Sequence, residues 1–514
     1  MKSKKIVLFL PAPSRTYPWT MLPLSLISVS SFLGTKGYEV SILTAKNDDW
    51  KDRVREETKD ALLFGTSAMT GYQITEGLEA SGIVRKYNQH VPIVWGGRHP
   101  TLSPVNTCEH PLVDIVVKGQ GESTLLEVAE CLSQSNGDGY DLNNVLGVLY
   151  KKDGKVVQTG ERPIQDPNNS PPYPFHYMDC KDYVYESEVG LKTFNYISSV
   201  GCPHGCRFCA EVAAFKRRWI GLKADRVIGD FKKLVEDYNV DGIWLNDSNY
   251  LTDKKRALAI AEGIIKENLN IKIGNVNSHC SNILQFNDDE WAILKKSGLY
   301  SVLIGAEGGS DDGLTLINKG ATIADTIKVV EKCGKAGVKV ILSFMVGIPR
   351  SEKYNISIDQ EIKDILLLLK KCHKISKNLE LSIFFYTPYP GTGFYSEALQ
   401  QGLKEPKNLE QWSQFELGNT QLPIVTERHK KYVKTINATM RQFSIKYKKL
   451  PEYSGYRLVR GKTWFRRVVF MTLESINYLI ALIRWKFLFF HFPIEHSVAN
   501  GIFAFKNYYD SKVK

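Results

Sequence analysis

Three cysteines stand close together in one stretch of the sequence, residues 199–209. Cys202, Cys206 and Cys209 are separated by three and then two residues, so their thiols share one tight loop. The turn-forming residues of this loop are Gly201, Pro203 and Gly205. Iron–sulfur clusters prefer soft thiolate ligands, and a 4Fe–4S cubane has one more iron than the loop has cysteines. The spacing therefore predicts a 4Fe–4S cluster with one iron open to a substrate or cosubstrate.

Two ordinary explanations compete with the cluster: a zinc site, and cysteines that simply fill an apolar core. Zinc needs a fourth ligand, and the nearest one, His204, lies inside the loop, where its geometry is poor. The loop also follows the first strand of a series of strand–helix units, which favours the cluster.

This series runs from about residue 192 to 405. The candidate strands are Thr193–Ser199, Gly242–Leu245, Ile271–Asn275, Ser301–Gly305, Val338–Phe344 and Leu381–Tyr386. Helical periodicity fills the gaps, for example over Ala224–Tyr238 and Thr322–Ala336. Six strand–helix units predict a partial or complete parallel barrel, which places its active site at the carboxyl ends of the strands.

A second alternating series precedes it, from residue 4 to about 135. Its apolar runs are Ile6–Leu10, Val40–Leu43, Ala61–Phe64, Ile93–Trp95 and Asp114–Val117, with helical patterns such as Ile74–Asn88 and Ser123–Leu132 between them. This alternation predicts an open parallel sheet with helices on both faces. Several runs end in small residues, which let backbone amides approach a ligand at the carboxyl ends of the strands.

The order of these patterns gives a domain organisation. We expect an α/β protein with a doubly wound, Rossmann-like domain over 1–160, a linker over 161–190 and a partial (βα)6 barrel over 191–405. A helical, basic and amphipathic region follows over 406–514. A hairpin, Val145–Tyr150 with Lys155–Thr159 around Asp153-Gly154, closes the first domain, and proline and asparagine are frequent in the linker.

The cysteine loop after a first barrel strand resembles that of the radical S-adenosylmethionine (SAM) superfamily. The resemblance implies that the open iron chelates SAM, and that one electron cleaves SAM to a 5′-deoxyadenosyl radical. It also implies a donor of that electron, such as a flavodoxin or ferredoxin. Phe208 matches the aromatic residue that packs on the adenine, and Asp247 and Asn249 match the second-strand motif that receives the methionyl ammonium.

Four further positions match motifs of the same family at later strand ends. They are Glu307 as a ribose or carboxylate contact, Ser343 and Gly347 in the fifth-strand motif, and Tyr386 at the close of the sixth strand. Each of these SAM assignments, including that of Asp247, has an ordinary structural alternative. Asp247 can be a solvated carboxylate or a helix cap, and Tyr386 can finish a core strand. The set of motifs covers about 210 residues and is specific only as a set.

The first domain resembles the cobalamin-binding domain that precedes many radical SAM cores, in the subgroup of the anaerobic magnesium-protoporphyrin cyclase. The residues implied as cobalamin contacts are Gly65, Thr66, Ser67, Gly96, Gly97, His99, Gly119, Gly121 and Glu122. The stretch after the first strand, Pro11–Tyr17, lacks the histidine that coordinates cobalt from below in methionine synthase-like proteins. No lower axial ligand is therefore named. The alternative is a degenerate domain that holds no corrin, and His99 then only stabilises its loop.

Two reactions follow from these parts. With methylcobalamin, the resemblance implies a C-methyltransferase that acts on an unactivated carbon of a hydrophobic, lipid or natural-product substrate. Without methyl transfer, the same site would carry out an oxidative cyclisation, a ring contraction or a carbon–carbon coupling. A non-enzymatic cobalamin or iron–sulfur sensor is a third alternative, but it predicts eroded barrel motifs, and these are largely intact.

Composition limits the remaining choices. A formal net charge of +12 can attract nucleic acid, an anionic membrane or an acidic substrate, and it identifies none of them. The other six cysteines are scattered singly, so we expect no disulfide framework. The first apolar run is short and ends at Pro11, which favours a strand over a signal peptide. We therefore expect a cytoplasmic location.

The last hundred residues are basic over 427–467 and then apolar. On a helical wheel of residues 466–486, one polar sector holds Arg466, Arg467, Glu474, Asn477 and Arg484. The charges argue against a membrane-spanning helix. An interfacial helix on the inner face of an anionic membrane, and a helix that covers the barrel, both fit the pattern. A tRNA-modifying enzyme is a weaker alternative, because no RNA-binding module is recognisable.

Overall fold

The computed structural model describes residues 3–14, 22–135, 140–352, 354–415, 420–444, 479–488 and 490. The chain forms two compact units. The first comprises Met1–Asn277 and Thr387–Gln421, and the second comprises Ser278–Tyr386 and Leu422–Lys514. The predicted barrel span, residues 191–405, is therefore divided between the two units after Asn277. The predicted domain boundaries stay a prediction.

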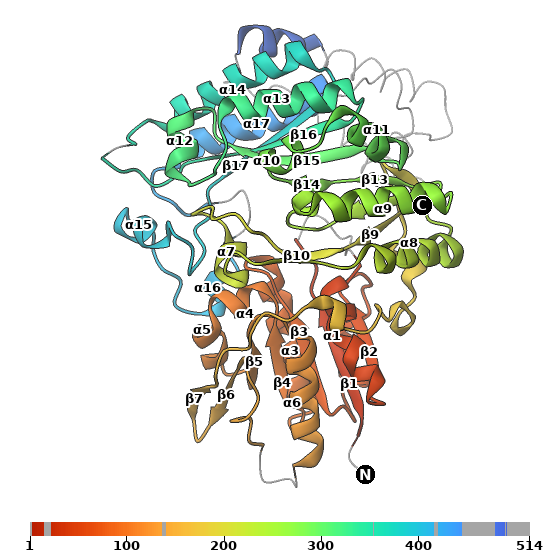
Figure 1. Ribbon diagram of the computed structural model, residues 1–514. Coiled ribbons are helices and arrows are strands. Elements are labelled where there is room, and N and C mark those ends of the chain that lie inside the picture. The colour runs from red at the N-terminus through yellow and green to blue at the C-terminus, as the bar shows by residue number, and fades with distance from the viewer. Residues whose placement is uncertain are drawn as a thin grey trace, which may run out of the picture. The chain divides into compact units, whose positions relative to one another are not determined.

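The first unit begins with a seven-stranded sheet in the order β2-β1-β3-β4-β5-β6-β7 (Figure 1). Its strands are β1 (Lys5–Leu10), β2 (Glu39–Thr44), β3 (Leu63–Ser67), β4 (Ile93–Gly96), β5 (Ile115–Val117), β6 (Val148–Lys152) and β7 (Lys155–Gln158). The first five are parallel, in the order 2-1-3-4-5 of a doubly wound fold. The chain order reverses direction between β1 and β3, and ligands of such folds bind at that switch point.

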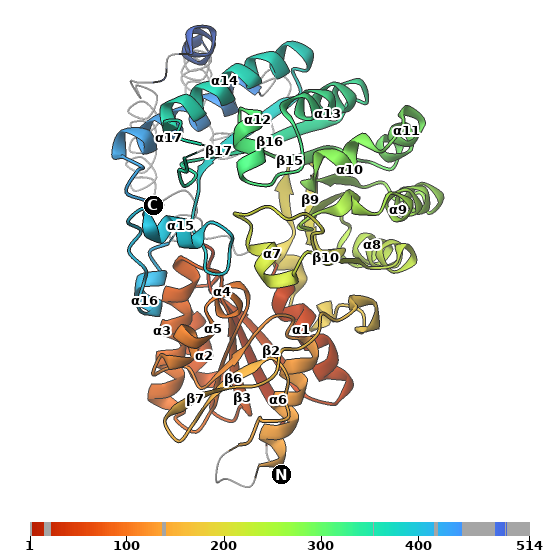
Figure 2. The same ribbon diagram turned by 60° about the vertical axis from the view of Figure 1, so that its left-hand side comes forward.

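Helices cover both faces of this sheet, as the sequence predicts. α1 (Leu24–Thr35) packs on α6 (Glu122–Gln134), and α2 (Trp50–Glu57) packs on α3 (Tyr72–Tyr87), on the opposite face (Figure 2). Short helices α4 (Arg98–Leu102) and α5 (Pro104–Glu109) follow β4. Because both faces are covered, the strand residues are apolar on both sides, and Ile6–Phe9 are almost fully buried.

The predicted hairpin is present as the antiparallel pair β6 and β7, with β6 also antiparallel to β5. Asp153 and Gly154 form its turn with φ values of 52° and 74°. Two left-handed residues at the centre of a two-residue loop are the geometry that matches the twist of the strands, and glycine adopts it at little cost.

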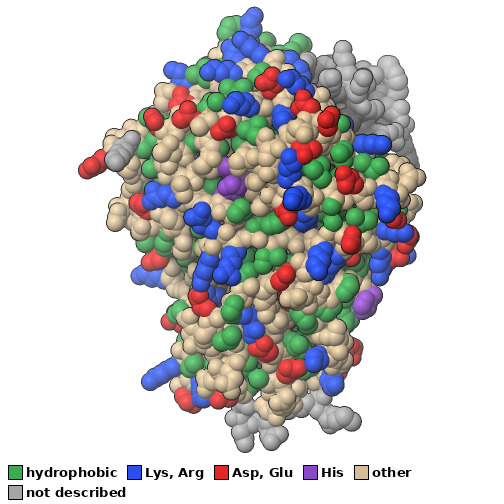
Figure 3. Space-filling view, in the orientation of Figure 1, with side chains coloured by type: hydrophobic (Ala, Val, Ile, Leu, Met, Phe, Trp, Pro, Cys, Tyr) green, Lys and Arg blue, Asp and Glu red, His purple; other side chains and the backbone are tan. Residues whose placement is uncertain are grey.

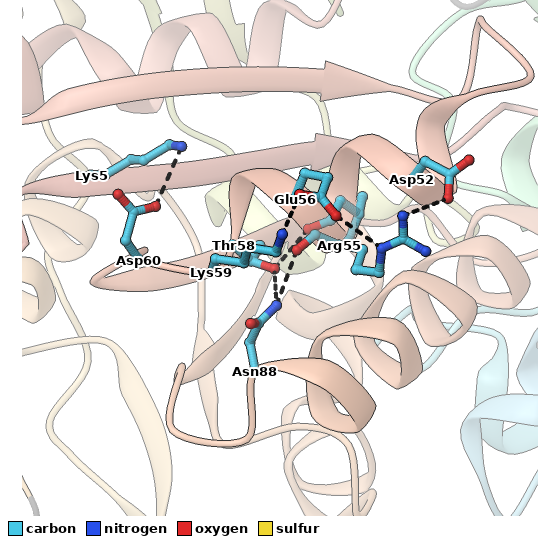
Figure 4. Close-up of polar contacts among 9 residues, drawn as sticks. Lys5, Asp52, Arg55, Glu56, Thr58, Lys59, Asp60 and Asn88 are labelled. Carbon is cyan, nitrogen blue, oxygen red and sulfur yellow. Dashed lines mark hydrogen bonds and ion pairs between the residues drawn. The ribbon is translucent and has the colours of Figure 1, made fainter.

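At the amino end of the parallel strands, charged and polar side chains pair with one another (Figure 4). Lys5 Nζ lies 2.9 Å from Glu57 and 3.6 Å from Asp60. Asn88 Nδ2 donates to Thr58 Oγ1 at 2.8 Å and to the Arg55 carbonyl at 3.2 Å. These contacts tie together the segments that lead into β1, β3 and β4.

The first unit continues with the beginning of the second series. It holds the sheet β13-β12-β9-β8 and the antiparallel pair β10 and β11. Their bounds are β8 (Tyr185–Ser187), β9 (Gly190–Tyr196), β10 (Ser199–Gly201), β11 (Trp219–Gly221), β12 (Gly242–Leu245) and β13 (Lys272–Gly274). The helices are α7 (Ala210–Phe215), α8 (Ala224–Tyr238), α9 (Lys254–Lys266), α15 (Tyr395–Gln400) and α16 (Leu409–Trp412), with single 3-10 turns at Pro167–Asn169, Phe175–Tyr177, Cys180–Tyr183 and Tyr250–Thr252.

The second unit is built on the sheet β14-β15-β16-β17, and the division between the units falls within β14. The strands are β14 (Val276–Ser278), β15 (Ser301–Glu307), β16 (Lys339–Val346) and β17 (Leu379–Phe385). The helices are α10 (Cys280–Leu284), α11 (Asp288–Lys296), α12 (Asp311–Leu316), α13 (Ile323–Lys335), α14 (Ile358–Ile375) and α17 (Glu427–Ser444).

All six predicted barrel strands are present. β9, β12 and β13 pair in parallel, and so do β15, β16 and β17, in chain order within each sheet. This arrangement is that of successive strand–helix units. Most of the predicted amphipathic segment 466–486 lies outside the described residues. Among the helices of the described ranges, none is long and apolar enough to cross a bilayer.

Candidate active site

The cysteine loop connects β10 to α7, and Cys209 is the residue that caps α7. The Cys209 N–H donates to the Cys206 carbonyl at 3.1 Å, which closes a tight turn. Cys206 is buried, whereas Cys202 and Cys209 are partly exposed. Gly201 enters the loop with φ at 75°, and a Cβ there would lie 2.1 Å from the Arg218 carbonyl oxygen. The close approach therefore requires glycine at this position.

The three thiols are close enough to influence one another. Burial raises the pKa of Cys209 to about 12, the N–H of Glu211 opposes this shift, and Glu211, Cys206 and Cys202 add to it electrostatically. Among the described residues, no three His, Cys, Asp or Glu side chains converge tightly enough to hold a single metal ion. A cubane attaches each thiolate to a different iron, so its ligands stand further apart than those of one ion. Three neighbouring thiols on one turn fit that donor set, and iron binding would displace their protons.

Asp247 holds the segment that leads into the cysteine loop. Its carboxylate is fully buried and accepts three hydrogen bonds: from Ser198 N–H at 2.7 Å and from the hydroxyls of Ser198 and Ser199 at 2.6 Å. Burial raises its pKa, against those hydrogen bonds and the charge of Arg256. Arg256 also donates to the Ser198 carbonyl at 2.8 Å. Both oxygens of Asp247 are thus engaged by the protein, and its predicted contact with SAM stays a prediction.

Asn249 lies directly against the loop. Its side-chain amide is 3.8 Å from Cys202 Sγ, and its carbonyl accepts a hydrogen bond from Trp219 Nε1 at 2.8 Å. Phe208, the predicted adenine contact, is partly exposed on the loop between two of the cysteines. The structure therefore brings Asn249 and Phe208 beside the cysteines, and their contact with SAM is untested.

A pocket of about 460 Å³ opens at the carboxyl ends of β1, β3, β4 and β5. Eight of the nine residues predicted to contact cobalamin line it: Gly65, Thr66, Ser67, Gly96, Gly97, Gly119, Gly121 and Glu122. Its wall also includes residues that flank the cysteine loop, namely Val200 on β10 and Ala214 and Phe215 on α7. The pocket therefore lies between the doubly wound sheet and the cysteine loop, inside one compact unit.

Two of these positions have left-handed backbone, and glycine serves a different purpose at each. Gly97 has φ at 97°, and a Cβ there would lie 2.6 Å from Ser67 Oγ. Gly119 has φ at 81° and open space where its Cβ would be, while its N–H donates to Thr101 Oγ1 at 3.0 Å. Left-handed backbone and open space together provide the cradle that a large planar ligand needs.

His99 is the ninth residue of the predicted cobalamin set, and it does not line this pocket. It is fully buried. Its Nδ1 lies 3.0 Å from Thr70 Oγ1, and its ring packs on Trp412 at 5.5 Å between centroids. Burial lowers the pKa of His99 to about 3, so the ring is neutral. The ring thus contacts Thr70 and Trp412, and the predicted contact of His99 with cobalamin stays a prediction.

Arg98 joins the pocket to the cysteine loop, and the sequence reasoning missed it. Its guanidinium forms an ion pair with Glu211, two residues beyond Cys209, and lies 5.5 Å from the Phe215 ring centroid. Arg98 and Phe215 both line the pocket. In the sequence, the only signal was the place of Arg98 inside the glycine motif, because Glu211 is more than a hundred residues away.

Arg207, between Cys206 and Phe208, was also missed. It forms an ion pair with Glu397, donates to the Gly393 carbonyl at 3.1 Å, and lies 4.1 Å from the Phe394 ring centroid. The segment 387–421 therefore returns to the cysteine loop within the first unit. Further along it, Trp412 packs on His99, as described above.

The second unit holds the other four predicted SAM residues. Glu307 ends β15 with φ at 62°, beside a register shift, and its carboxylate lies 3.7 Å from Lys319 Nζ. Burial raises its pKa, and Lys319 opposes the shift. A residue with a side chain is strained in the left-handed region, and such strain concentrates at functional sites.

The remaining three are Ser343, Gly347 and Tyr386. Ser343 pairs in register with Gly305 and Ser382. The Gly347 N–H donates to the Glu361 carboxylate at 2.8 Å, at a φ of 79°. Tyr386 is buried directly after β17. Gly347 and Tyr386 directly follow β16 and β17, whereas Ser343 lies within β16, and the binding of SAM by all three stays a prediction.

Comparison with known proteins identifies the family. The radical SAM superfamily model matches residues 196–355, and the B12 binding domain model matches residues 15–129. An uncharacterized methyltransferase of Pyrococcus horikoshii is 30% identical over 414 residues, which cover 78% of this chain and 85% of the relative. The chain belongs to the radical SAM superfamily. The radical SAM domain implies a 4Fe–4S cluster and SAM, and the B12-binding domain implies cobalamin.

Two more comparisons show which radical SAM enzymes this chain resembles. It is 26% identical to the anaerobic magnesium-protoporphyrin IX monomethyl ester cyclase of Rubrivivax gelatinosus, over 72% of this chain and 65% of the cyclase. Its fold is similar to the radical SAM methyltransferase TsrM of Kitasatospora setae, with a TM-score of 0.61 and 18% identity, over 79% of this chain and 76% of that one. The order of B12-binding and radical SAM domains is thus confirmed, and it favours an enzyme over the sensor alternative.

Proposed function

We propose that this enzyme is a cobalamin-dependent C-methyltransferase that acts on an unactivated carbon of a hydrophobic small molecule. One observation carries the proposal: a single pocket has the glycine-rich strand ends of the B12-binding domain on one side and the flanks of the cysteine loop on the other. The 30% identity to the uncharacterized methyltransferase of Pyrococcus horikoshii supports methyl transfer as the reaction class.

When bound, the cluster supplies the electron that cleaves SAM to a radical, and methylcobalamin supplies the methyl group. The chain's own residues position these groups. Gly119, with open space at its Cβ position, would let the corrin approach the backbone, and Glu122, which accepts a hydrogen bond from Ser28 Oγ at 2.6 Å, would present its carboxylate to the ligand. Asp247 holds the entry to the cysteine loop, and Arg98 connects the pocket with α7 through Glu211.

The apolar residues of the pocket serve a second purpose. Radical chemistry requires that water and side reactions be kept out of the site. Leu8, Leu10 and Val94 from the sheet face the same cavity as Val200 and Phe215 from the cysteine-loop side. A largely apolar lining of this kind excludes water once the corrin is bound.

Oxidative cyclisation or carbon–carbon coupling is the second candidate, and the similarity to the cyclase of Rubrivivax gelatinosus favours it over the others. The two candidates differ in the fate of the methyl group. In methyl transfer the carbon of the SAM methyl appears in the product, whereas in cyclisation it does not.

The experiment uses the protein purified with its cluster and cobalamin under anaerobic conditions. SAM with a deuterated methyl group and a reductant are added, and mass spectrometry follows both the corrin and a cell extract of candidate substrates. We expect labelled methyl on the corrin and then in a product. A corrin-free preparation that still converts the substrate, or a product that never carries the label, would contradict the proposal.

We also propose an electron donor of the flavodoxin or ferredoxin class, and contact of the C-terminal region with a membrane surface. Support for the membrane contact lies in the described helix 479–487. Leu479, Ile483 and Phe487 recur every four residues and are 58%, 60% and 68% exposed. Replacing these three by serine should reduce sedimentation with anionic vesicles several-fold. Unchanged sedimentation would contradict the proposed membrane contact and would not affect the methyl-transfer proposal.

A further inference from the structure

Three consecutive cationic residues, Lys216, Arg217 and Arg218, form an exposed turn directly after α7. We call Lys216–Arg218 the basic turn. Lys216 and Arg217 both have left-handed backbone, with φ at 50° and 62°. Left-handed backbone is unfavourable for a residue with a side chain, so two in succession persist only where the surroundings impose them.

The cysteine loop imposes this conformation. Arg217 Nε donates to the carbonyl of Pro203, the neighbour of Cys202, at 3.4 Å. The Arg218 carbonyl packs against Gly201, where no Cβ would fit, and the next residue, Trp219, pairs with Gly201 in the β10–β11 ladder. The basic turn is therefore fixed to the backbone that carries the cluster ligands.

Two of its three charges are available to a partner. Lys216 pairs with Glu161, whose pKa Lys216 and Lys118 together lower to about 2. Within the described ranges, Arg217 and Arg218 have no acidic side chain at ion-pair distance. On the face drawn in Figure 3, Lys and Arg side chains are interspersed with Asp and Glu side chains. Adjacent arginines without acidic partners thus form a local concentration of positive charge.

We infer that the basic turn is the docking surface for an acidic one-electron donor protein of the flavodoxin or ferredoxin class. This inference rests on the proposed function, because that chemistry needs one electron delivered to the cluster. The reduced donor loses one electron and the cluster gains it, with no bond made or broken. A donor held at the basic turn stands beside the cysteine loop, and opposite charges accelerate and orient such encounters.

Nucleic acid is a less suitable occupant. Proteins that bind it without a recognisable module follow its backbone with a stripe of cations along one face or helix. The basic turn offers only three cations in one place, too few to follow a long polymer. Its contacts with Gly201 and Pro203 put it next to the loop that holds the cluster.

The test compares two doubly substituted enzymes with the same change of charge. R217E/R218E reverses the available charges of the basic turn, and K152E/K155E reverses two exposed lysines of the β6–β7 hairpin. Binding of oxidised flavodoxin is measured by calorimetry, and cluster reduction by reduced flavodoxin is followed by stopped-flow absorbance and electron paramagnetic resonance. At low salt, R217E/R218E should lose about tenfold or more in both measurements, and K152E/K155E about twofold or less.

A cationic small reductant, reduced methyl viologen, serves as the internal control. Because Arg217 also donates to the Pro203 carbonyl beside Cys202, the single variant R218E is measured alongside. Reduced methyl viologen should reduce the cluster of R218E and of K152E/K155E and support SAM cleavage at the wild-type rate, which shows that the cluster loop is intact. Equal flavodoxin kinetics in wild type and R217E/R218E, or an equal loss in K152E/K155E, would overturn the inference. So would loss of binding to a labelled RNA oligonucleotide with flavodoxin reduction unchanged. Failure of the proposed function is distinguishable, because it leaves viologen-driven SAM cleavage in place without methyl transfer.

Discussion

The two ends of the N-terminal sheet are built in opposite ways. At the amino end, Lys5 pairs with Glu57 and Asp60, and Asn88 satisfies Thr58 and the backbone before it (Figure 4). At the carboxyl end, the strands finish in glycines and small polar residues around a pocket of about 460 Å³. Both ends belong to the same strands and the same core. The difference shows that the fold is stabilised at one end and left open for a ligand at the other.

The largest effect is expected where the open end meets the cysteine loop. Replacing Cys202, Cys206 or Cys209 by alanine removes a cluster ligand. We expect iron and sulfide content to fall to near zero after anaerobic reconstitution and SAM cleavage to be abolished, since a cubane needs all three thiolates. The control is Cys131→Ala on α6, which should retain the cluster. A cysteine-loop variant that still cleaves SAM under reductant would refute the cluster assignment.

Next come two glycines with the same backbone at opposite ends of the sheet. Gly119 and Gly154 have φ at 81° and 74°, and each has open space at its Cβ position. Valine at either site should cost roughly 1–2 kcal/mol of stability, measured by urea unfolding. Only Gly119→Val puts a side chain into the pocket, so only it should weaken cobalamin binding, by about tenfold or more, in equilibrium dialysis. Equal cobalamin affinity in both variants would mean that the pocket is not the corrin site.

A smaller effect is expected from two partly buried ion pairs. Arg98–Glu211 lies at the pocket, and Arg85–Asp114 lies at the amino end of β5. Each pair is worth about 1 kcal/mol. Arg98→Gln should lower cobalamin affinity about fivefold and alter the electron paramagnetic resonance spectrum of the cluster, whereas Arg85→Gln should affect only unfolding. A spectrum and an affinity unchanged in Arg98→Gln would show that the pocket and loop are not coupled through this pair.

The smallest effect is expected at the amino end of the sheet, where Lys5 lies, and it depends on pH. Burial opposes the charge of Lys5, but Glu57 and Asp60 outweigh it and raise the pKa above its ordinary value of 10.5. A raised lysine pKa stabilises the fold fully below 10.5, and this contribution is lost as pH rises through the folded value. Lys5→Met should therefore lose ~0.5 kcal/mol at neutral pH and less above 10.5, with cobalamin affinity unchanged. A deficit that grows at high pH would contradict this reasoning.

The sequence allowed accurate prediction of features that depend on neighbouring residues. β12 spans Gly242–Leu245, as predicted, and the Asp153-Gly154 turn has the left-handed backbone that such a pair favours. β3 was placed too early, because the apolar run Ala61–Phe64 hides the fact that pairing with β4 extends to Ser67. Hydrophobic pattern reports burial, whereas strand bounds depend on the partner strand.

By itself, the sequence determined the chemistry that the chain can hold. The spacing of Cys202, Cys206 and Cys209 specifies a shared loop, and glycines at strand ends specify a crevice, because local backbone geometry depends on the residue types that are adjacent. Only the tertiary structure decided what surrounds these residues. In the folded chain, Asp247 accepts hydrogen bonds from two serines and His99 packs on Trp412. Arg98 pairs with Glu211, more than a hundred residues away in the sequence. Such contacts depend on how distant segments pack, and no local pattern in the chain records them.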